Sequence, residues 1–159
     1  MVEQAVFLVG GLGTRLGDLT REVPKPMLPV GGQPFLSYLI ENVRRHGLTK
    51  IILLCGYRAE FIAQYFAGDS SVTVVHEPTL AGTEGALTYA SDLLDDRFFL
   101  FNGDTLFDFN VLSLVPAFEG LATLALRPQA PGRRSGWVAL EGSRVQAFHG
   151  PETGPGGPI

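Results

Sequence analysis

The first apolar segment of the chain is Ala5-Val6-Phe7-Leu8-Val9, which passes directly into Gly10-Gly11-Leu12-Gly13-Thr14-Arg15-Leu16. A continuous apolar run that ends in glycines is typical of a strand buried on both faces of a parallel sheet. Glycines leave the backbone N–H groups uncovered, and a turn of such groups can surround a phosphate. The segment therefore predicts a buried strand that ends in a phosphate-binding loop.

Two cations accompany this loop. Arg15 closes the glycine run, and Lys25 follows within Pro24-Lys25-Pro26-Met27-Leu28-Pro29. Backbone amides alone do not neutralise a polyphosphate, whereas a guanidinium and an ammonium together can. The glycine run and the two cations together predict a nucleoside-triphosphate site.

Other glycine-rich sites fit the sequence less well. A dinucleotide-binding loop requires an acidic residue about 20 positions further on, at the end of the second strand. The second apolar run ends in Cys55-Gly56-Tyr57-Arg58 and offers no carboxylate to a ribose, and no Gly-Lys-Ser/Thr of a P-loop follows the first glycines. The remaining alternative is that the glycines only form turns, and the two cations weigh against it.

Apolar runs alternate with helical patterns along the chain. The expected strands are 5–9, 50–55, 72–76, 98–101, 121–126, 137–140 and 144–148, and the expected helices are 35–46, 59–66, 85–94 and 111–118. The glycine and proline content of residues 10–34 opposes helix and predicts one long loop. Strands that alternate with helices predict an α/β fold of three layers around a mostly parallel, doubly wound sheet.

Bulk composition restricts the class of protein. The 159 residues are 45% hydrophobic and 18% charged with a net charge of −4, which suits a single domain over residues 1–159. The acidic balance opposes nucleic-acid binding, and no apolar stretch is long enough for a membrane span. The single cysteine, Cys55, fits a cytoplasmic protein without disulfides. Residues 150–159 hold four glycines and three prolines and are expected to be a flexible tail.

Three separated motifs resemble one enzyme family. They are Gly10–Leu16 with Lys25–Pro29, Glu77 with Gly82-Thr83-Glu84-Gly85-Ala86-Leu87, and Asn102-Gly103-Asp104. The combination resembles the sugar-1-phosphate nucleotidylyltransferases, and among them the bacterial heptose and mannose 1-phosphate guanylyltransferases. The resemblance implies a Rossmann-like nucleotidyltransferase fold and an enzyme of nucleotide-sugar and cell-surface polysaccharide biosynthesis. Such an enzyme transfers a nucleoside monophosphate from a nucleoside triphosphate, with GTP favoured, to a sugar 1-phosphate, and it uses Mg²⁺ and releases pyrophosphate.

The resemblance also implies roles for the first motif. Arg15 is expected to stabilise the departing pyrophosphate, and Lys25 to bridge the α-phosphate and the incoming sugar phosphate. The loop residues expected to hold the β- and γ-phosphates are Gly10, Gly11, Gly13 and Thr14. The attacking phosphate is already ionised, so no general base is expected.

Asp104 is the expected metal ligand. It directly follows a buried strand, and ligands of open α/β sheets gather at that edge. Its hard carboxylate oxygens suit Mg²⁺, which takes one or two carboxylates together with phosphate oxygens and waters. The alternative is that Asp104 only caps the following turn.

The second motif implies a site for the base and ribose. Glu77 can accept hydrogen bonds from both N1–H and the 2-amino group of guanine, whereas uracil and thymine offer a single donor. The residues expected to line this site with Glu77 are Gly82, Thr83 and Gly85. Glu84 departs from the family, which has a small residue there.

The sugar-binding half departs further from the family. Gly136 matches a sugar-contacting glycine, but His149-Gly150 stands where the family has a Glu-Lys pair whose lysine binds the sugar phosphate. His149 is expected to begin the flexible tail. No second metal carboxylate is assigned, and the chain is expected to be incomplete at its C-terminus. A homo-oligomer is compatible with the family.

Three alternatives remain open from the sequence. The missing Glu-Lys pair motivates a non-catalytic paralogue that binds a nucleotide or nucleotide sugar as a regulator. A molybdenum-cofactor-type guanylyltransferase shares the glycine loop, but it usually has an acidic residue shortly before its lysine, where this chain has Pro24. The third alternative is a domain whose glycine turns are purely structural.

Overall fold

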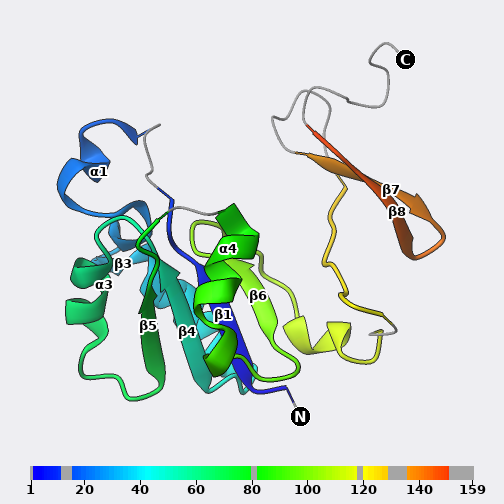
Figure 1. The fold of residues 1–159 in the computed structure, drawn as a ribbon, viewed down its shortest axis with the longest axis horizontal. Helices are drawn as coiled ribbons and strands as arrows, with labels where there is room; N and C mark the ends of the chain where they lie inside the picture. Colours follow the sequence, from blue (N-terminus) through cyan, green and yellow to red (C-terminus); the bar gives the residue numbers. More distant parts are fainter. Residues whose placement is uncertain (1, 12–15, 80–81, 118–119, 129–135, 151–159) are drawn as a thin grey trace. The chain divides into compact units, whose positions relative to one another are not determined.

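The computed structural model describes residues 2–11, 16–79, 82–117, 120–128 and 136–150. The contacts divide the chain into two compact units, Met1–Ala117 and Phe118–Ile159. The first unit contains a four-stranded sheet with helices, and the second contains a two-stranded hairpin (Figure 1).

The four-stranded sheet of the first unit is entirely parallel. Its strands are β1 (Gln4–Leu8), β4 (Lys50–Cys55), β5 (Val72–His76) and β6 (Phe99–Asn102), in the spatial order β5-β4-β1-β6. The chain builds outward from β1 through β4 and β5, and then returns to place β6 on the other side of β1. The winding therefore reverses at β1, and the carboxyl ends of β1 and β6 form the topological switch point of the sheet.

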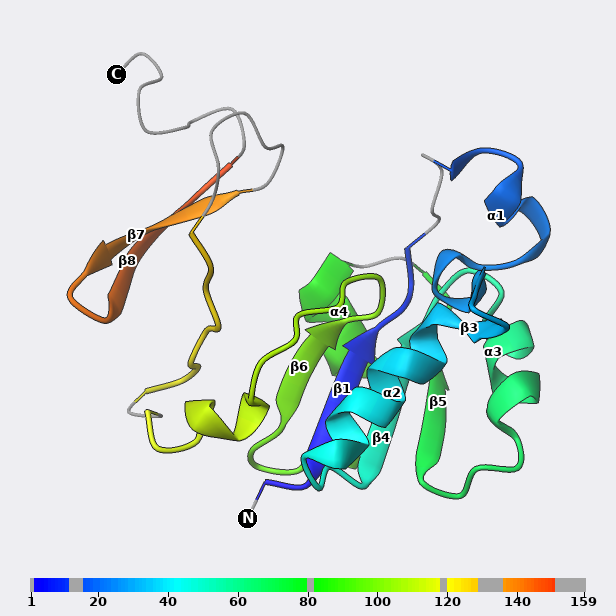
Figure 2. The same cartoon turned by 180° about the vertical axis from the view of Figure 1, so that it is seen from behind.

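Helices cover both faces of this sheet. They are α2 (Phe35–Arg45) and α3 (Ala59–Phe66) on one face and α4 (Gly82–Tyr89) on the other, as the two opposite views show (Figure 2). Phe7 of β1 lies in the core under α2 and α3, whereas its neighbour Val6 lies in the core under α4. The prediction of a three-layer, mostly parallel α/β fold is confirmed. None of the helices within the described ranges is long and apolar enough to cross a lipid bilayer.

Residues 10–34 are more structured than their glycine and proline content predicts, so the expectation of one long loop is wrong. The described part contains α1 (Leu19–Glu22), the 3₁₀ turn η2 (Lys25–Met27) and the strands β2 (Pro29–Val30) and β3 (Gln33–Pro34). Proline fixes φ near the value that a helical turn needs, and Pro26 occupies the first turn of η2. Gly31 and Gly32 have φ of 57° and 97°, which closes the hairpin turn between β2 and β3.

Three other expectations are also corrected. The helix expected over 85–94 begins at Gly82 and ends at Tyr89, and the 3₁₀ turn η3 (Ser91–Leu93) follows it. The helix expected over 111–118 is the 3₁₀ turn η4 (Val111–Leu114). Within the described residues 120–128 no strand forms, and Leu121, Leu124 and Leu126 are all exposed, so the segment buries no apolar face.

The second unit contains the antiparallel strands β7 (Trp137–Glu141) and β8 (Arg144–His149). The Trp137 and His149 rings stack with their centroids 3.9 Å apart, so His149 belongs to β8 and does not begin the tail as expected. A Cβ on Gly136 would lie 2.7 Å from the His149 carbonyl oxygen, which gives Gly136 a local packing role. Residues 151–159 of the expected tail lie outside the described residues.

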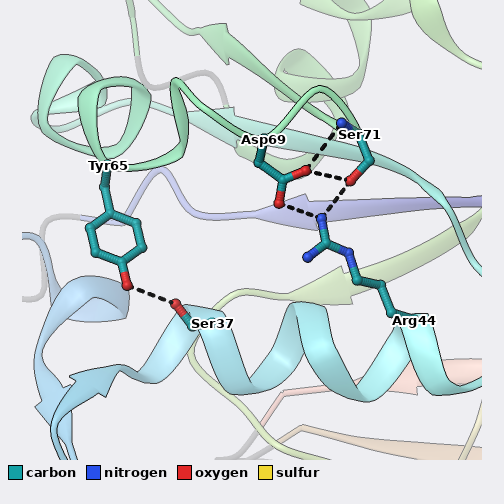
Figure 3. Close-up of polar contacts among 5 residues, drawn as sticks. All are labelled: Ser37, Arg44, Tyr65, Asp69 and Ser71. Atoms are coloured by element: carbon teal, nitrogen blue, oxygen red, sulfur yellow. Dashed lines mark hydrogen bonds and ion pairs between the residues drawn. The ribbon is translucent and has the colours of Figure 1, made fainter.

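A polar cluster ties α2 to the turn before β5 (Figure 3). Arg44 donates to the Asp69 carboxylate at 2.5 Å and to the Ser71 hydroxyl, and Asp69 also accepts from the Ser71 N–H at 3.1 Å. The Arg44 guanidinium and the Ser71 hydroxyl lower the pKa of Asp69. The Ser37 hydroxyl of α2 lies 3.5 Å from the Tyr65 hydroxyl oxygen of α3. The Arg44 contacts thus join α2 to the turn between α3 and β5.

Gly103 provides a test of how tightly β6 is joined to β1. A Cβ there would lie 2.1 Å from Val9 Cγ1 and 2.9 Å from the Leu8 carbonyl oxygen. We expect Gly103→Ala to lower the free energy of unfolding by about 1–3 kcal/mol, as overpacking does in other cores. Urea denaturation gives this value. The matched control is Gly68→Ala, which meets no atom within 4 Å and should change stability by less than about 0.5 kcal/mol. A Gly103→Ala protein as stable as the wild type would contradict this packing.

Candidate functional site

Polar and glycine residues follow every strand of the parallel sheet at its carboxyl edge. The strand ends are level with one another, since Leu8 of β1 is paired with both Leu54 of β4 and Asn102 of β6. In the order β5, β4, β1, β6, the residues that follow the strands include Glu77, Gly56, Gly10 and Asp104. The edge spans about 14 Å from β5 to β6, three strand spacings of about 4.8 Å. Ligands of open α/β sheets bind at this edge.

Lys25 and Asp104 meet at the β6 end of this edge. Lys25 Nζ lies 2.6 Å from Asp104 Oδ2, although the two residues are 79 positions apart in sequence. Lys25 and the Thr105 hydroxyl, which donates to Oδ1 at 3.0 Å, lower the pKa of the Asp104 carboxyl. The Lys25 and Asp104 side chains are 38% and 43% exposed, so both remain accessible to a ligand. An ionised carboxylate and an ammonium therefore stand side by side at the switch point.

The prolines and Met27 position Lys25. Pro24 and Pro26 are buried, and Met27 is 3% exposed and lies in the main core. The Met27 N–H donates to the Pro24 carbonyl at 2.8 Å, and the Leu28 N–H donates to the Lys25 carbonyl at 3.2 Å. Buried neighbours on both sides thus hold the Lys25 backbone and leave its side chain at the surface.

Glu77 lies against the start of the glycine loop. It is 6% exposed, and its N–H donates to the Cys55 carbonyl at 2.7 Å. A Cβ on Gly10 would lie 3.0 Å from Glu77 Oε1 and 3.4 Å from the Gly56 nitrogen, so the absence of a side chain at Gly10 gives room to this carboxylate. Burial raises the pKa of the Glu77 carboxyl above its ordinary value, and the nearby His76 partly opposes the rise.

Cys55 lies beside this carboxylate but offers no chemistry. Its side chain is completely buried, and burial together with the charge of Glu77 raises the pKa of the thiol. The nucleophilic thiolate is therefore unavailable at neutral pH.

The second glycine motif forms the start of α4. Gly82 begins the helix with φ of 72°, and Gly85 lies in its first turns, so residues 82–84, which precede the helix predicted over 85–94, are helical as well. Thr83 also belongs to this turn. The hydroxyls of Thr79 and Tyr89 lie 3.0 Å apart and join the segment after β5 to the end of α4. This contact joins the end of α4 to the chain two residues after Glu77.

The structure brings only part of the predicted site together. Gly10, Gly11, Lys25, Glu77 and Asp104 belong to the first unit and lie at or next to the carboxyl ends of its strands. The predicted residues Gly13, Thr14 and Arg15 lie outside the described residues. Gly136 belongs to the second unit, where its described contact is with His149 of the same hairpin.

Sequence reasoning missed Tyr57 and Arg58, which follow β4. The Tyr57 hydroxyl and the Arg58 guanidinium donate to the Arg21 carbonyl at 2.8 and 3.0 Å. The available signal was a pair of polar side chains directly after a buried strand, at the edge where ligands bind.

The described residues at this edge could hold a metal ion only if a substrate supplies further oxygen ligands. Within the described ranges no three His, Cys, Asp or Glu side chains cluster to hold a metal. Asp104 supplies one ionised carboxylate, which satisfies the protein's share of a Mg²⁺ site when phosphates and waters supply the other oxygens.

The Lys25–Asp104 contact makes a direct prediction. Removal of the ammonium in Lys25→Met should raise the pKa of Asp104 towards its ordinary value of about 3.9, and carboxyl ¹³C NMR titration measures it. Lys50→Met, which breaks the separate pair with Asp95, should leave the titration of Asp104 unchanged. Because the folded pKa of Asp104 is lowered, the pair stabilises the fold above about pH 4, and this stabilisation disappears as the pH falls through the lowered value. Exposure limits it to about 1 kcal/mol at most. An unchanged Asp104 titration in Lys25→Met would contradict the contact.

Comparison with known proteins gives two close curated relatives. A family profile described as nucleotidyl transferase matches residues 4–150. The chain is 36% identical over 152 residues to D-glycero-alpha-D-manno-heptose 1-phosphate guanylyltransferase of Aneurinibacillus thermoaerophilus, covering 91% of this chain and 66% of the relative. It is 34% identical over 143 residues to the protein of the same name from Campylobacter jejuni, covering 87% and 63%. The chain thus spans slightly less than two thirds of the length of these relatives.

Solved structures agree on the fold. The structure of HddC from Yersinia pseudotuberculosis, determined in complex with GMP-PN, aligns with a TM-score of 0.72 and 24% sequence identity. The alignment covers 93% of this chain and 69% of the HddC chain. The structure of the CTP:phosphocholine cytidylyltransferase LicC from Streptococcus pneumoniae aligns with a TM-score of 0.58 and 27% sequence identity, over 65% of this chain and 46% of the LicC chain. With the family profile extending over most of the sequence, the chain belongs to the nucleotidyl transferase family.

Proposed function

We propose that this protein transfers a nucleoside monophosphate from a nucleoside triphosphate, with GTP favoured, to a sugar 1-phosphate. The observation that carries the proposal is the Lys25–Asp104 pair, which joins an ammonium and an ionised carboxylate at the switch point of the sheet. The names of the two curated relatives, both heptose 1-phosphate guanylyltransferases, support the same reaction. The cytoplasm and the biosynthesis of nucleotide sugars for cell-surface polysaccharides are the setting that this activity suggests.

The reaction is an in-line phosphoryl displacement. An oxygen of the sugar phosphate forms a bond to the α-phosphorus, and the bond from that phosphorus to the β-phosphate oxygen breaks and releases pyrophosphate. The attacking oxygen is already ionised, so the protein has to position two anions and neutralise charge rather than remove a proton. Lys25 serves this purpose between the α-phosphate and the nucleophile. Arg15, Gly11, Gly13 and Thr14 are assigned to the departing phosphates.

Asp104 is the residue that would hold the divalent cation, with Mg²⁺ proposed. The bound cation supplies positive charge to the phosphate oxygens of the nucleotide. The lowered pKa of Asp104 keeps its carboxylate ionised, and thus ready for a cation, throughout the physiological range. When a phosphate binds, the Lys25 ammonium can pair with it in place of the Asp104 carboxylate, so the charge of Lys25 stays compensated. The Asp104 carboxylate then becomes available to the cation.

Glu77 supports guanine as the base. Its carboxylate is buried beside Gly10 at the β5 end of the edge, whereas Asp104 stands at the β6 end. A nucleotide whose base is at Glu77 and whose phosphates lie towards Asp104 would cross the glycine loop. Two donors on one edge of guanine match two carboxylate oxygens, and a site built for that match discriminates against bases that lack it.

Gly136 remains the residue assigned to the sugar, and a heptose or mannose 1-phosphate is the proposed acceptor. His149, which replaces the expected acidic residue of the pair, is held in β8 by its stacking on Trp137.

Pyrophosphate release tests the activity. The purified full chain is incubated with Mg²⁺, one nucleoside triphosphate and a panel of sugar 1-phosphates that includes heptose and mannose 1-phosphate. We expect release with GTP, and a loss of about 10²–10³ in kcat/KM in Lys25→Met and Asp104→Asn, because each removes a charge that acts on the phosphates. Lys50→Met is the matched control and should retain wild-type rates. Nucleotide binding without release would indicate the regulatory paralogue instead, and release with molybdopterin alone would indicate the molybdenum-cofactor enzyme.

The raised pKa of Glu77 predicts how GTP binding depends on pH. Guanine donors favour the ionised carboxylate, so GTP affinity should fall as the pH is lowered through that raised pKa, by up to about tenfold per pH unit below it. Calorimetric titration between pH 8 and 4 measures the dependence. Glu77→Gln should remove this part of the dependence and weaken the preference for GTP over UTP, while the titration of the nucleotide itself affects both proteins equally. Identical pH profiles in the two proteins would contradict the role of Glu77.

A further inference from the structure

The Arg21 carbonyl oxygen on α1 accepts hydrogen bonds from two side chains of the turn that follows β4. The Tyr57 hydroxyl donates to the Arg21 carbonyl at 2.8 Å, and Arg58 Nη2 donates to the same oxygen at 3.0 Å. Arg58 Nε in turn donates to the Tyr57 hydroxyl at 3.2 Å, and the guanidinium carbon lies 5.7 Å from the centroid of the Tyr57 ring. The two side chains therefore act as one unit on a single carbonyl, and we call them the Tyr57–Arg58 clamp.

The clamped oxygen belongs to a segment that needs outside support. Helix α1 has four residues, and so short a helix is not stable by itself in water. The last carbonyls of a helix have no partner within it, so they depend on side chains or water. The nearby Arg21–Asp18 ion pair, at 3.7 Å, is local to the segment and highly exposed. The clamp instead connects α1 to the turn after β4, which the buried strand holds in place.

Arg58 adopts a conformation that favours glycine. Its φ is 53° and its ψ is 42°, and within the described residues it is the non-glycine position with positive φ. A residue with a Cβ is strained there, and such strain persists where surrounding contacts hold it. A glycine would relieve the strain but would lose the guanidinium. The strain is consistent with a requirement for the side chain at the end of β4.

We propose that Tyr57 and Arg58 are positioning residues that hold α1 in place for the nucleotide. The clamped segment lies between Gly10 and Lys25, so it connects the glycine loop with the lysine that meets Asp104. A segment that is ordered before binding does not have to be ordered by the ligand, and this raises affinity. The inference rests on the proposed function for the identity of the ligand. It assigns the pair an effect on nucleotide binding rather than on the chemical step.

The first test removes one hydroxyl. Tyr57→Phe keeps the ring and deletes the donor to Arg21. We expect faster amide hydrogen exchange over residues 16–22 in the absence of nucleotide. The Kd for Mg²⁺·GTP and the KM for GTP should each rise about three- to tenfold, the range that corresponds to one net hydrogen bond. The kcat should change less than either. Tyr65→Phe is the matched control. It deletes a tyrosine hydroxyl on α3 that is 3.5 Å from its partner, and it should change none of these quantities.

The second test separates positioning from stability. Arg58→Gly relieves the strained backbone and removes the guanidinium, whereas Arg58→Ala removes the guanidinium and keeps the strain. We expect both variants to bind Mg²⁺·GTP more weakly, while Arg58→Gly unfolds at a higher urea concentration than Arg58→Ala. A purely structural residue would lose stability and affinity together.

Two results would overturn the inference. One is wild-type affinity for GTP, or wild-type exchange over residues 16–22, in both Tyr57→Phe and Arg58→Gly. The other is an affinity loss in Tyr65→Phe equal to that in Tyr57→Phe. A wild-type chain that binds none of the nucleoside triphosphates would contradict the proposed function, and the exchange of residues 16–22 would then still decide whether the clamp holds α1.

Discussion

The contact between the carboxyl ends of β1 and β6 determines where the charged groups of the site lie. The Gly103 N–H donates to the Leu8 carbonyl at 2.9 Å, and no side chain fits at Gly103 because Val9 occupies the space. Asp104 is consequently fixed next to the end of β1, where the chain leaves the sheet. Lys25 reaches the same point because its buried neighbours anchor its backbone. Without this close approach the switch point would present no paired charges.

The two ends of the edge offer different chemistry, and the difference matches a nucleotide. The β6 end has an exposed ammonium and an ionised carboxylate, which suit phosphates and a divalent cation. The β5 end has a buried carboxylate of raised pKa, which suits a base with two donors. The glycine at position 10 keeps the path between these ends free of a side chain. Catalysis by such an edge depends on position and charge, since phosphate nucleophiles need no base.

Local patterns predicted the parts of the fold that local forces dominate. The apolar run Ala5–Val9 and the spacing within residues 35–46 predicted β1 and α2. The motif residues Lys25, Glu77 and Asp104 lie at or next to the carboxyl edge of the sheet, and their functional roles stay predictions. Composition failed for residues 10–34, where prolines and the Gly31-Gly32 turn build a 3₁₀ turn and a hairpin. The strand predicted from the apolar run over residues 121–126 is also wrong, because Leu121, Leu124 and Leu126 are exposed and have no packed face. The position of Tyr57 and Arg58 directly after a buried strand was a usable signal, but their common acceptor, the Arg21 carbonyl 36 and 37 positions away, could not be read from a local pattern.

The carboxyl edge from Glu77 to Asp104 is the proposed binding site of the nucleotide and its metal. A crystal structure of the chain with a non-hydrolysable GTP analogue and Mn²⁺ tests it most directly, because the anomalous signal locates the metal independently of the rest of the map. The account predicts Mn²⁺ coordinated by Asp104 and by phosphate oxygens, with the guanine hydrogen-bonded to Glu77. A metal bound away from Asp104, or a nucleotide at the opposite edge of the sheet, would contradict it.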